Sequence, residues 1–278
     1  MKPLHPTESA VPGGIHLCQV REGLSCGACC GLYNVADASR SALHRLLQIR
    51  TKAFEAIERT VDSLTAFAEA ELYKLEPGPY PEFHHCPYVG LIGERKQHVG
   101  CLLHPAGGGN NGTDYRGLSY YGGMACRMYF CPSHEQLAPL AKKIICHAAP
   151  DWYTYGLWIT ETELLQAFLA QIETRLGYAP AADQLVHRPQ AMQGVHAFLA
   201  LKFRWPYRTS TQQHPCNYFF KDRRCHPSDV ADAGAGAEPS RFDGIFHPLG
   251  STFNDARQLA EAEDMLDTIF DFIIADIR

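Results

Sequence analysis

The chain has 278 residues, of which 46% are hydrophobic and 20% charged, a composition typical of one large or two modest globular domains. Its formal net charge of −5 argues against a general nucleic-acid binder, because phosphate binding normally leaves a basic surface. The N-terminal sequence lacks the apolar segment of a signal peptide, and no apolar run reaches the roughly 18 residues that a membrane helix needs. We therefore expect a cytoplasmic protein without a membrane partner, in a compartment where thiols stay reduced.

The first half of the chain alternates between helical and irregular sequence. Apolar residues spaced by three and four predict one long helix over residues 39–74, with Arg50 as the exception in the stripe. Two aliphatic segments at 89–92 and 99–103, joined by a polar turn, predict a short β-hairpin. The Gly- and Asn-rich segment 107–112 is expected to be a flexible insertion that covers the metal centre predicted below from the cysteines.

Helices also dominate the second half. Ser133 is predicted to cap a helix that runs through Ala148 and is either bent or delayed by Pro139. The sequence from Thr160 to Glu163 has the pattern of a capping box and predicts a helix that ends at Gly177. The remaining expected elements are a helix at 189–203, an irregular segment at 206–252 with a low-complexity tip at 231–238, and a last helix capped by Asn254.

These elements predict a mainly α fold with an irregular, cysteine-rich metal-binding part and room for one short β-hairpin. Residues 1–150 are expected to form the cysteine-rich module, including the long helix at 39–74. Residues 151–278 are expected to form a helical C-terminal part.

Cysteine usage is the most unusual feature of the chain, which contains eleven cysteines. An odd number cannot close into a complete set of intramolecular disulfides, and thiolates are preferred ligands of zinc and iron. The spacing therefore predicts a metal centre drawn together from two distant stretches. The candidate ligands are Cys18, Cys26, Cys29, Cys30, Cys86, Cys101, Cys126 and Cys131.

The adjacent pair Cys29 and Cys30 limits how these ligands can be used. Cys26 and Cys29 have the two-residue separation that lets one tight turn grip one metal. Neighbouring side chains in extended backbone point in opposite directions, so Cys29 and Cys30 do not suit a single mononuclear zinc. Two interpretations remain open: two neighbouring metals, or one ligand with one supporting thiol.

The order of the eight cysteines resembles the zinc- or iron-chelating CxxCxxCC (YkgJ-like) family. The likeness covers residues 18–132 and includes Cys-Pro-Tyr at Cys86, Gly-Cys at Cys101 and the Cys-Arg-x-Tyr-x-Cys run that begins at Cys126. It implies that all eight cysteines are metal ligands. The same motif occurs in proteins that resemble flagellin lysine N-methylases, and residues 150–278 have no counterpart in the likeness.

Three roles follow from this pattern. The chain is expected to be a metal-binding protein with a zinc or iron–sulfur site that supports the fold and, in one version, a protein partner. The alternatives are a methyl- or redox-transfer enzyme that uses a metal cluster, and a metal-handling or redox-sensing protein. The adjacent pair and the loose spacings favour an iron–sulfur cluster, with zinc as the alternative.

Other polar residues receive simpler interpretations. Histidines near the cysteines are expected to hydrogen-bond around the centre more readily than to bind metal; they are His84, His85, His98 and His104. A second zinc site at His214, Cys216, Cys225 and His226 is weighed against an ordinary loop, and the loop is preferred. Cys146 and the cationic, aromatic segment 202–208 are assigned structural roles.

Overall fold

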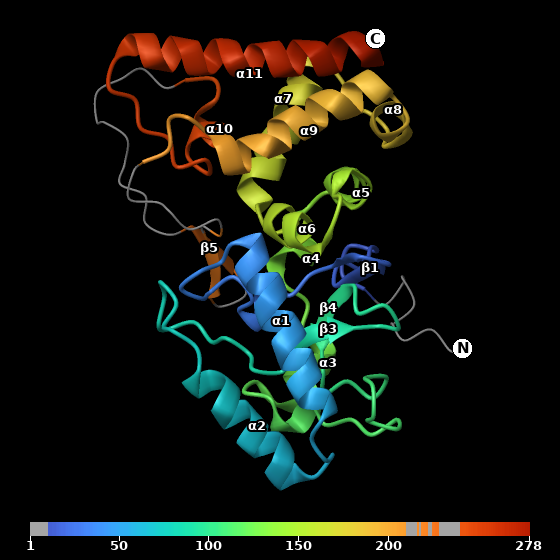
Figure 1. Ribbon diagram of the computed structural model, residues 1–278. Coiled ribbons are helices and arrows are strands. Elements are labelled where there is room, and N and C mark those ends of the chain that lie inside the picture. Colours follow the sequence, from blue (N-terminus) through green and yellow to red (C-terminus); the bar gives the residue numbers. More distant parts are fainter. Residues whose placement is uncertain (1–10, 210–215, 217, 222–223, 228–239) are drawn as a thin grey trace. The chain divides into compact units, whose positions relative to one another are not determined.

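The computed structural model describes residues 11–209, 216, 218–221, 224–227 and 240–278 (Figure 1). The fold is mainly helical, which confirms the predicted class, and it carries three two-stranded antiparallel sheets. The chain divides into two compact units. The cysteine-bearing unit contains the described residues up to His134 together with Pro150–Leu157, and the C-terminal unit contains Glu135–Ala149 and the chain from Trp158 onward.

Two helices of the cysteine-bearing unit replace the single helix predicted over 39–74. They are α1 (Arg40–Glu55) and α2 (Val61–Tyr73), so the prediction of one long helix is wrong. Thr60 ends the connection by accepting a hydrogen bond from the Ser63 backbone N–H, the usual role of an N-cap threonine. Arg59 donates to the Phe54 carbonyl in the last turn of α1 and to the Ile57 carbonyl just after it. The break leaves the apolar spacing intact, which is why periodicity alone did not reveal it.

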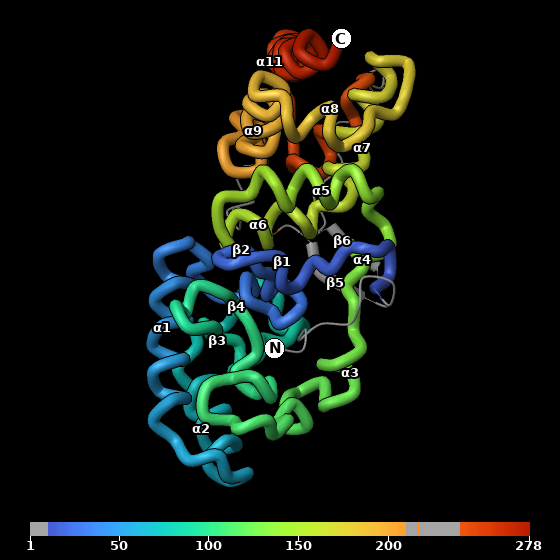
Figure 2. The backbone as a smooth tube through the Cα atoms, turned by 90° about the vertical axis from the view of Figure 1, so that its right-hand side faces the viewer, coloured from blue at the N-terminus to red at the C-terminus, as the bar shows by residue number. Residues whose placement is uncertain are grey.

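Two hairpins lie side by side in the cysteine-bearing unit (Figure 2). The predicted hairpin at 89–103 is confirmed as β3 (Val89–Ile92) and β4 (His98–Cys101), with Val89 opposite Cys101. A second, unpredicted hairpin joins β1 (Gln19–Arg21) and β2 (Leu24–Ser25). Ser25 Oγ accepts a hydrogen bond of 2.7 Å from the Val99 backbone N–H, so β2 lies against β4.

Short helical turns carry much of the remaining sequence of this unit. They are η2 (Ala28–Cys30), η3 (Arg116–Leu118), α3 (Gly122–Met128) and α4 (Pro132–Gln136), the last of which ends in the C-terminal unit. Helix α6 (Trp152–Ile159) starts in the cysteine-bearing unit and is anchored there by two tyrosines. Tyr155 Oη donates to the Leu17 carbonyl at 2.8 Å, and Tyr33 Oη donates to the Tyr153 carbonyl at 3.0 Å.

The C-terminal unit is built from helices that pack around phenylalanine rings. Its elements are α5 (Pro139–Ala148), α7 (Thr162–Leu176), α8 (Asp183–Val186), α9 (Pro189–Arg204), β5 (Tyr218–Lys221), β6 (Arg224–Pro227), α10 (Asp243–Phe246) and α11 (Ala256–Ile277). The rings of Phe168, Phe198 and Phe270 come from α7, α9 and α11 and have centroids 4.5–5.7 Å apart. Aromatic burial therefore joins the three longest helices of this unit.

Three helix starts differ from those predicted. The expected helix from Ser133 to Ala148 is interrupted, because Pro139 cannot continue a helix and instead begins α5. The N-cap of α7 is Glu161 and not the expected Thr160; the Glu161 side chain makes no cap hydrogen bond and pairs with the buried Lys202. Asp255, not Asn254, caps α11 by accepting from the backbone N–H of Gln258.

Other predictions for the second half have mixed outcomes. The helix at 189–203 is confirmed as α9, and Gly177 ends α7 with a left-handed φ of 79°. The tip at 231–238, His214 and the side chains of Cys225 and His226 lie outside the described residues. None of the described helices has the length and apolar composition needed to span a membrane.

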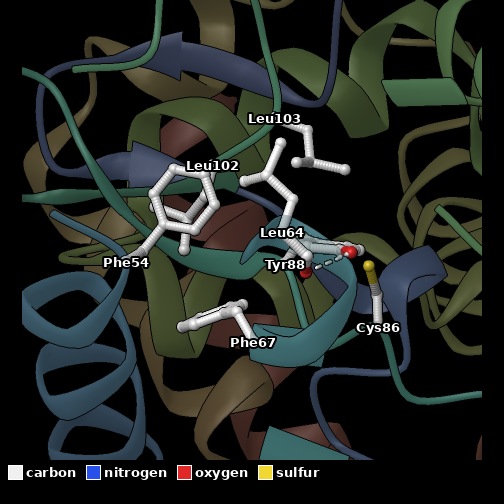
Figure 3. Packing of buried hydrophobic residues seen from close by; sticks show 7 residues of the cluster. All are labelled: Phe54, Leu64, Phe67, Cys86, Tyr88, Leu102 and Leu103. Atoms are coloured by element: carbon white, nitrogen blue, oxygen red, sulfur yellow. Dashed lines mark hydrogen bonds between the residues drawn. The ribbon is translucent and has the colours of Figure 1, made fainter. Parts of the chain in front are cut away.

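A compact apolar cluster supports one side of the cysteine region. It contains Phe54, Leu64, Phe67, Cys86, Tyr88, Leu102 and Leu103 (Figure 3). Tyr88 fixes the chain here by donating from its hydroxyl to the Leu64 carbonyl at 2.9 Å. Cys86 is itself a buried member of this cluster, so its position is set by core packing from α1, α2 and the segment after β4.

Candidate metal centre

Cys18 and Cys26 flank the β1–β2 hairpin, and the turn η2 follows directly. The Cys26 backbone N–H donates to the Cys18 carbonyl at 3.0 Å, which holds the two residues at one end of the hairpin. The Ala28 backbone N–H approaches the Cys26 sulfur at 3.5 Å. This single tight turn therefore presents the sulfur-bearing residues Cys26, Cys29 and Cys30 from one short piece of chain.

The second stretch of cysteines meets this turn through the backbone. The Cys86 N–H donates to the Cys30 carbonyl at 2.8 Å, across 56 residues of sequence. Cys101 is the last residue of β4 and lies opposite Val89, the first residue of β3. Cys126 is on α3, where its sulfur lies 3.0 Å from Ser119 Oγ. Cys18, Cys29, Cys30, Cys86, Cys101 and Cys126 are free thiols.

Mutual electrostatic effects define a first group of four cysteines. Burial raises the pKa of Cys18 well above its ordinary value, and the negative charges of Cys29, Cys131 and Cys26 raise it further. Such effects require that these thiols lie close together in a medium with little water. We call Cys18, Cys26, Cys29 and Cys131 the first thiol group.

The other four cysteines form a second thiol group by the same criterion. Burial raises the pKa of Cys86 to about 11 and that of Cys101 to about 12, and the negative charge of Cys126 raises both. The pKa of Cys30 is raised most by its hydrogen bond to Cys29, then by burial and by Cys86 and Cys101. The second thiol group is Cys30, Cys86, Cys101 and Cys126.

The adjacent residues Cys29 and Cys30 join the two groups. Their side chains hydrogen-bond, which lowers the pKa of Cys29 and raises that of Cys30. Each residue nevertheless has its other thiol neighbours in a different group, apart from an effect of Cys29 on Cys86. Cys29 and Cys30 are therefore the point at which the two thiol groups meet.

A buried histidine in the first group was not singled out in the sequence. His134 Nε2 accepts from the Leu17 N–H at 3.1 Å, so its proton is on Nδ1, which lies 3.5 Å from the Cys131 sulfur. His134 thus links the residue before Cys18 to Cys131, over 117 residues. The signal was the spacing Cys-x-x-His at the start of α4.

His85 has the corresponding place in the second group, where a hydrogen-bonding role was expected. Its Nδ1 lies 2.8 Å from the Gly31 carbonyl, next to Cys30, and burial lowers its pKa to about 3. The other three histidines that flank the cysteines have different surroundings. His84 stacks on Tyr120 with ring centroids 4.1 Å apart, His98 belongs to β4, and His104 Nδ1 accepts from the Ala106 N–H.

The Gly- and Asn-rich segment 107–112 is held in place by Asn110 and by Arg59, which lies in the connection between α1 and α2. Asn110 is buried and donates to the carbonyls of Leu102 and His104 at 2.7 Å each. Arg59 donates to Asn110 Oδ1 at 2.9 Å and to the Gly108 carbonyl. Tyr121 lies near thiols of both groups, because its pKa is raised by burial and then by Cys29, Cys30 and Cys86.

A carboxylate fixes α3, the helix that carries Cys126. Asp114 accepts from Arg116 and Arg127 at 2.7 Å each, and these arginines hold its pKa below the ordinary range. The Arg116 pKa is raised first by Asp114 and further by the thiolates of Cys101 and Cys126. Asp114 therefore holds the Arg116 guanidinium within electrostatic reach of Cys101 and Cys126 in the second thiol group.

Replacing Asp114 with asparagine is expected to lower the free energy of unfolding by about 1 kcal/mol at pH 7, because two partly exposed ion pairs are lost. The depressed pKa means that this contribution is complete above the ordinary aspartate pKa of about 4 and is lost as the pH falls toward the folded-state pKa. Urea unfolding at pH 7 and pH 3 should show the difference between wild type and variant shrinking at pH 3. The same stability difference at both pH values would contradict the lowered pKa of Asp114.

The fold and the site together define a mainly helical protein with eight thiols in two electrostatically linked groups of four. Within the described residues, no group of three or more His, Cys, Asp and Glu side chains converges in a way that could hold a metal ion. The chain matches no family model, no curated protein and no solved structure. The likeness to the CxxCxxCC family therefore depends on cysteine order and spacing alone.

Proposed function

We propose that this chain is a metal-binding protein in which each thiol group holds a zinc ion or an iron–sulfur centre. The observation that carries the proposal is that the two distant cysteine stretches meet, since the Cys86 N–H donates to the Cys30 carbonyl at 2.8 Å. The pKa effects among the thiols support it, because they divide the eight cysteines into two groups of four that join at Cys29 and Cys30. Four thiolates close the coordination of a tetrahedral zinc, and four also hold a [2Fe–2S] or [4Fe–4S] cluster. Bound metal would staple the two distant cysteine stretches together.

The chemistry of the donor set fits such a group. Burial keeps thiols such as Cys86 and Cys101 protonated at neutral pH, and a bound cation would replace those protons. Metal binding should then release protons and stabilise the cysteine-bearing unit. The cations Arg50 and Arg116 lie within electrostatic reach of the second group and would offset its negative charge.

The metal-handling alternative has one observation in its favour. Cys126 is exposed, whereas Cys86 is buried and the other candidate ligands are half-buried. An exposed ligand is the one through which a metal can enter or be passed to a protein partner. The enzyme alternative, a methyl- or redox-transfer protein of the kind that the sequence likeness suggests, would need an open coordination position. For any of these roles we place the protein in the cytoplasm, where thiols stay reduced.

Anaerobic purification followed by analysis for zinc, iron and acid-labile sulfide tests the proposal. Two zinc ions per chain, or iron with sulfide and a brown colour, would support it and decide between the two centres. A chelator that strips the metal slowly and melts the cysteine-bearing unit would indicate a structural site. Rapid exchange with the fold retained would indicate metal handling. Protein that carries neither metal nor sulfide and does not bind added Zn²⁺ would overturn the proposal.

A further inference from the structure

Arg50 is a fully buried cation on α1, at the one charged position of the predicted apolar stripe. Its side chain is 0% exposed, and burial lowers its pKa. A buried charge is expensive unless its surroundings satisfy it, so the partners of Arg50 show why it is there. Glu71 supplies one of them, at 3.3 Å from Nε, and also accepts from Lys74 at 2.8 Å.

The other partners of Arg50 belong to the segment that carries a ligand of the second thiol group. Nη1 donates to the Cys86 carbonyl at 3.3 Å and to the Val89 carbonyl at 3.2 Å, and lies 3.1 Å from His85 Nε2. A purely structural ion pair in the core would need only the Glu71 carboxylate as the partner of Arg50. The three contacts of Nη1 instead clamp residues 85–89 onto α1.

His85 extends this clamp to the turn that carries Cys30. Because an arginine can only donate, His85 Nε2 must accept, and the proton of the neutral imidazole is therefore on Nδ1. That Nδ1–H donates to the Gly31 carbonyl at 2.8 Å. A continuous chain of hydrogen bonds thus runs from Arg50 through His85 to the residue that follows Cys30.

One donor of Arg50 has not been used. Nη2 is buried and has no hydrogen-bond acceptor among the described residues. An unsatisfied buried donor costs about 1–3 kcal/mol, and more for a charged group. The charge of Arg50 also acts on Cys86, whose pKa it lowers against the larger effect of burial.

We propose that Arg50 is a positioning residue of the second thiol group. Through the Cys86 carbonyl and His85 it fixes Cys86 and Cys30 relative to each other, and its charge stabilises an anionic metal–thiolate centre. This inference rests on the proposed metal binding. It distinguishes the two groups, because Arg50 makes no hydrogen bond or charge interaction with the first group in the described part of the chain.

The test compares Arg50→Met with Arg59→Met, using Co²⁺ as a probe and its thiolate charge-transfer absorption as the readout. Arg59 is the matched control, because it also makes several hydrogen bonds in this unit but faces Phe54, Ile57 and Asn110. Both variants should lose thermal stability. Only Arg50→Met should bind Co²⁺ more weakly, by about 10–100-fold, the usual effect of removing an outer partner of a metal ligand.

Two backgrounds locate the effect. When the first group is disabled by Cys131→Ser, Arg50→Met should weaken Co²⁺ binding at the remaining site. When the second group is disabled by Cys126→Ser, Arg50→Met should leave the Co²⁺ affinity of the remaining site unchanged. His85→Phe, which removes the relay without leaving a buried charge unpaired, should reproduce the loss if Arg50→Met does not fold. A Co²⁺ affinity of Arg50→Met equal to that of the wild type would overturn this inference and leave the proposed function standing. If Arg50→Met does not fold, a wild-type affinity in His85→Phe would do the same. Wild-type protein that binds no Co²⁺ would overturn both.

Discussion

Gly31→Ala is expected to separate the two cysteine-bearing stretches and to destabilise the protein by about 3 kcal/mol or more. Gly31 has a φ of +74°, where an L side chain alone costs roughly 1–2 kcal/mol. The added Cβ would also lie 2.0 Å from the His84 carbonyl oxygen and 2.8 Å from the His85 Cα. These are backbone atoms, so the overlap cannot be relieved by a rotamer change and adds a further 1–3 kcal/mol or so.

Gly23→Ala is the matched control for this prediction. Gly23 has nearly the same φ, +75°, but a Cβ there would have nothing within 4 Å. It should therefore show the conformational cost alone. Urea unfolding and metal content of both variants provide the measurement, and only Gly31→Ala should lose the metal of the second thiol group. Equal losses of stability in the two variants would show that the junction at Gly31 is not tight.

Cys29→Ser is expected to lower bound metal in both thiol groups, because Cys29 belongs to the first and hydrogen-bonds to Cys30 of the second. Cys126→Ser should affect the second group alone. Structural metal in small thiolate sites contributes on the order of 10 kcal/mol to folding, so losing one centre should cost several kcal/mol. Elemental analysis and protease sensitivity of the cysteine-bearing unit are the measurements.

Cys146→Ser supplies the control, because Cys146 lies on α5 in the C-terminal unit. The metal content of the Cys146→Ser variant and the protease sensitivity of its cysteine-bearing unit should equal those of the wild type. Unchanged metal stoichiometry in both Cys29→Ser and Cys126→Ser would remove the basis for the ligand assignment.

Periodicity predicted the helical content well and the helix boundaries poorly. Apolar residues recur in register on both sides of residues 56–60, so nothing in the spacing marks the break between α1 and α2. The break depends on Thr60 as a cap and on Arg59, which donates back to the Phe54 carbonyl at the end of α1. Glu161 shows the effect of distant sequence at a helix start, since the N-cap residue of α7 pairs with the buried Lys202, 41 residues away.

The candidate site was predictable in its members and not in its grouping. Chain order alone would pair early with early and late with late cysteines. The effects of the thiols on one another's pKa instead group Cys131 with Cys18, and Cys30 with Cys86 and Cys101. Such pairings depend on contacts over long stretches of sequence, such as that between His134 and Leu17, which no local pattern encodes. Arg50 was visible in the sequence only as an exception to an apolar stripe.

The path of the chain between the units limits how this protein can be cut or recombined. A gene fragment that ends at residue 134 encodes all eight candidate ligands but omits Pro150–Leu157, and with it the Tyr155 hydroxyl that holds the backbone beside Cys18. A fragment that ends at 157 restores that contact but carries Glu135–Ala149 away from the unit in which it packs. The cysteine-bearing unit therefore cannot be transferred by a single crossover in the gene, and the two units are expected to have been inherited as one piece.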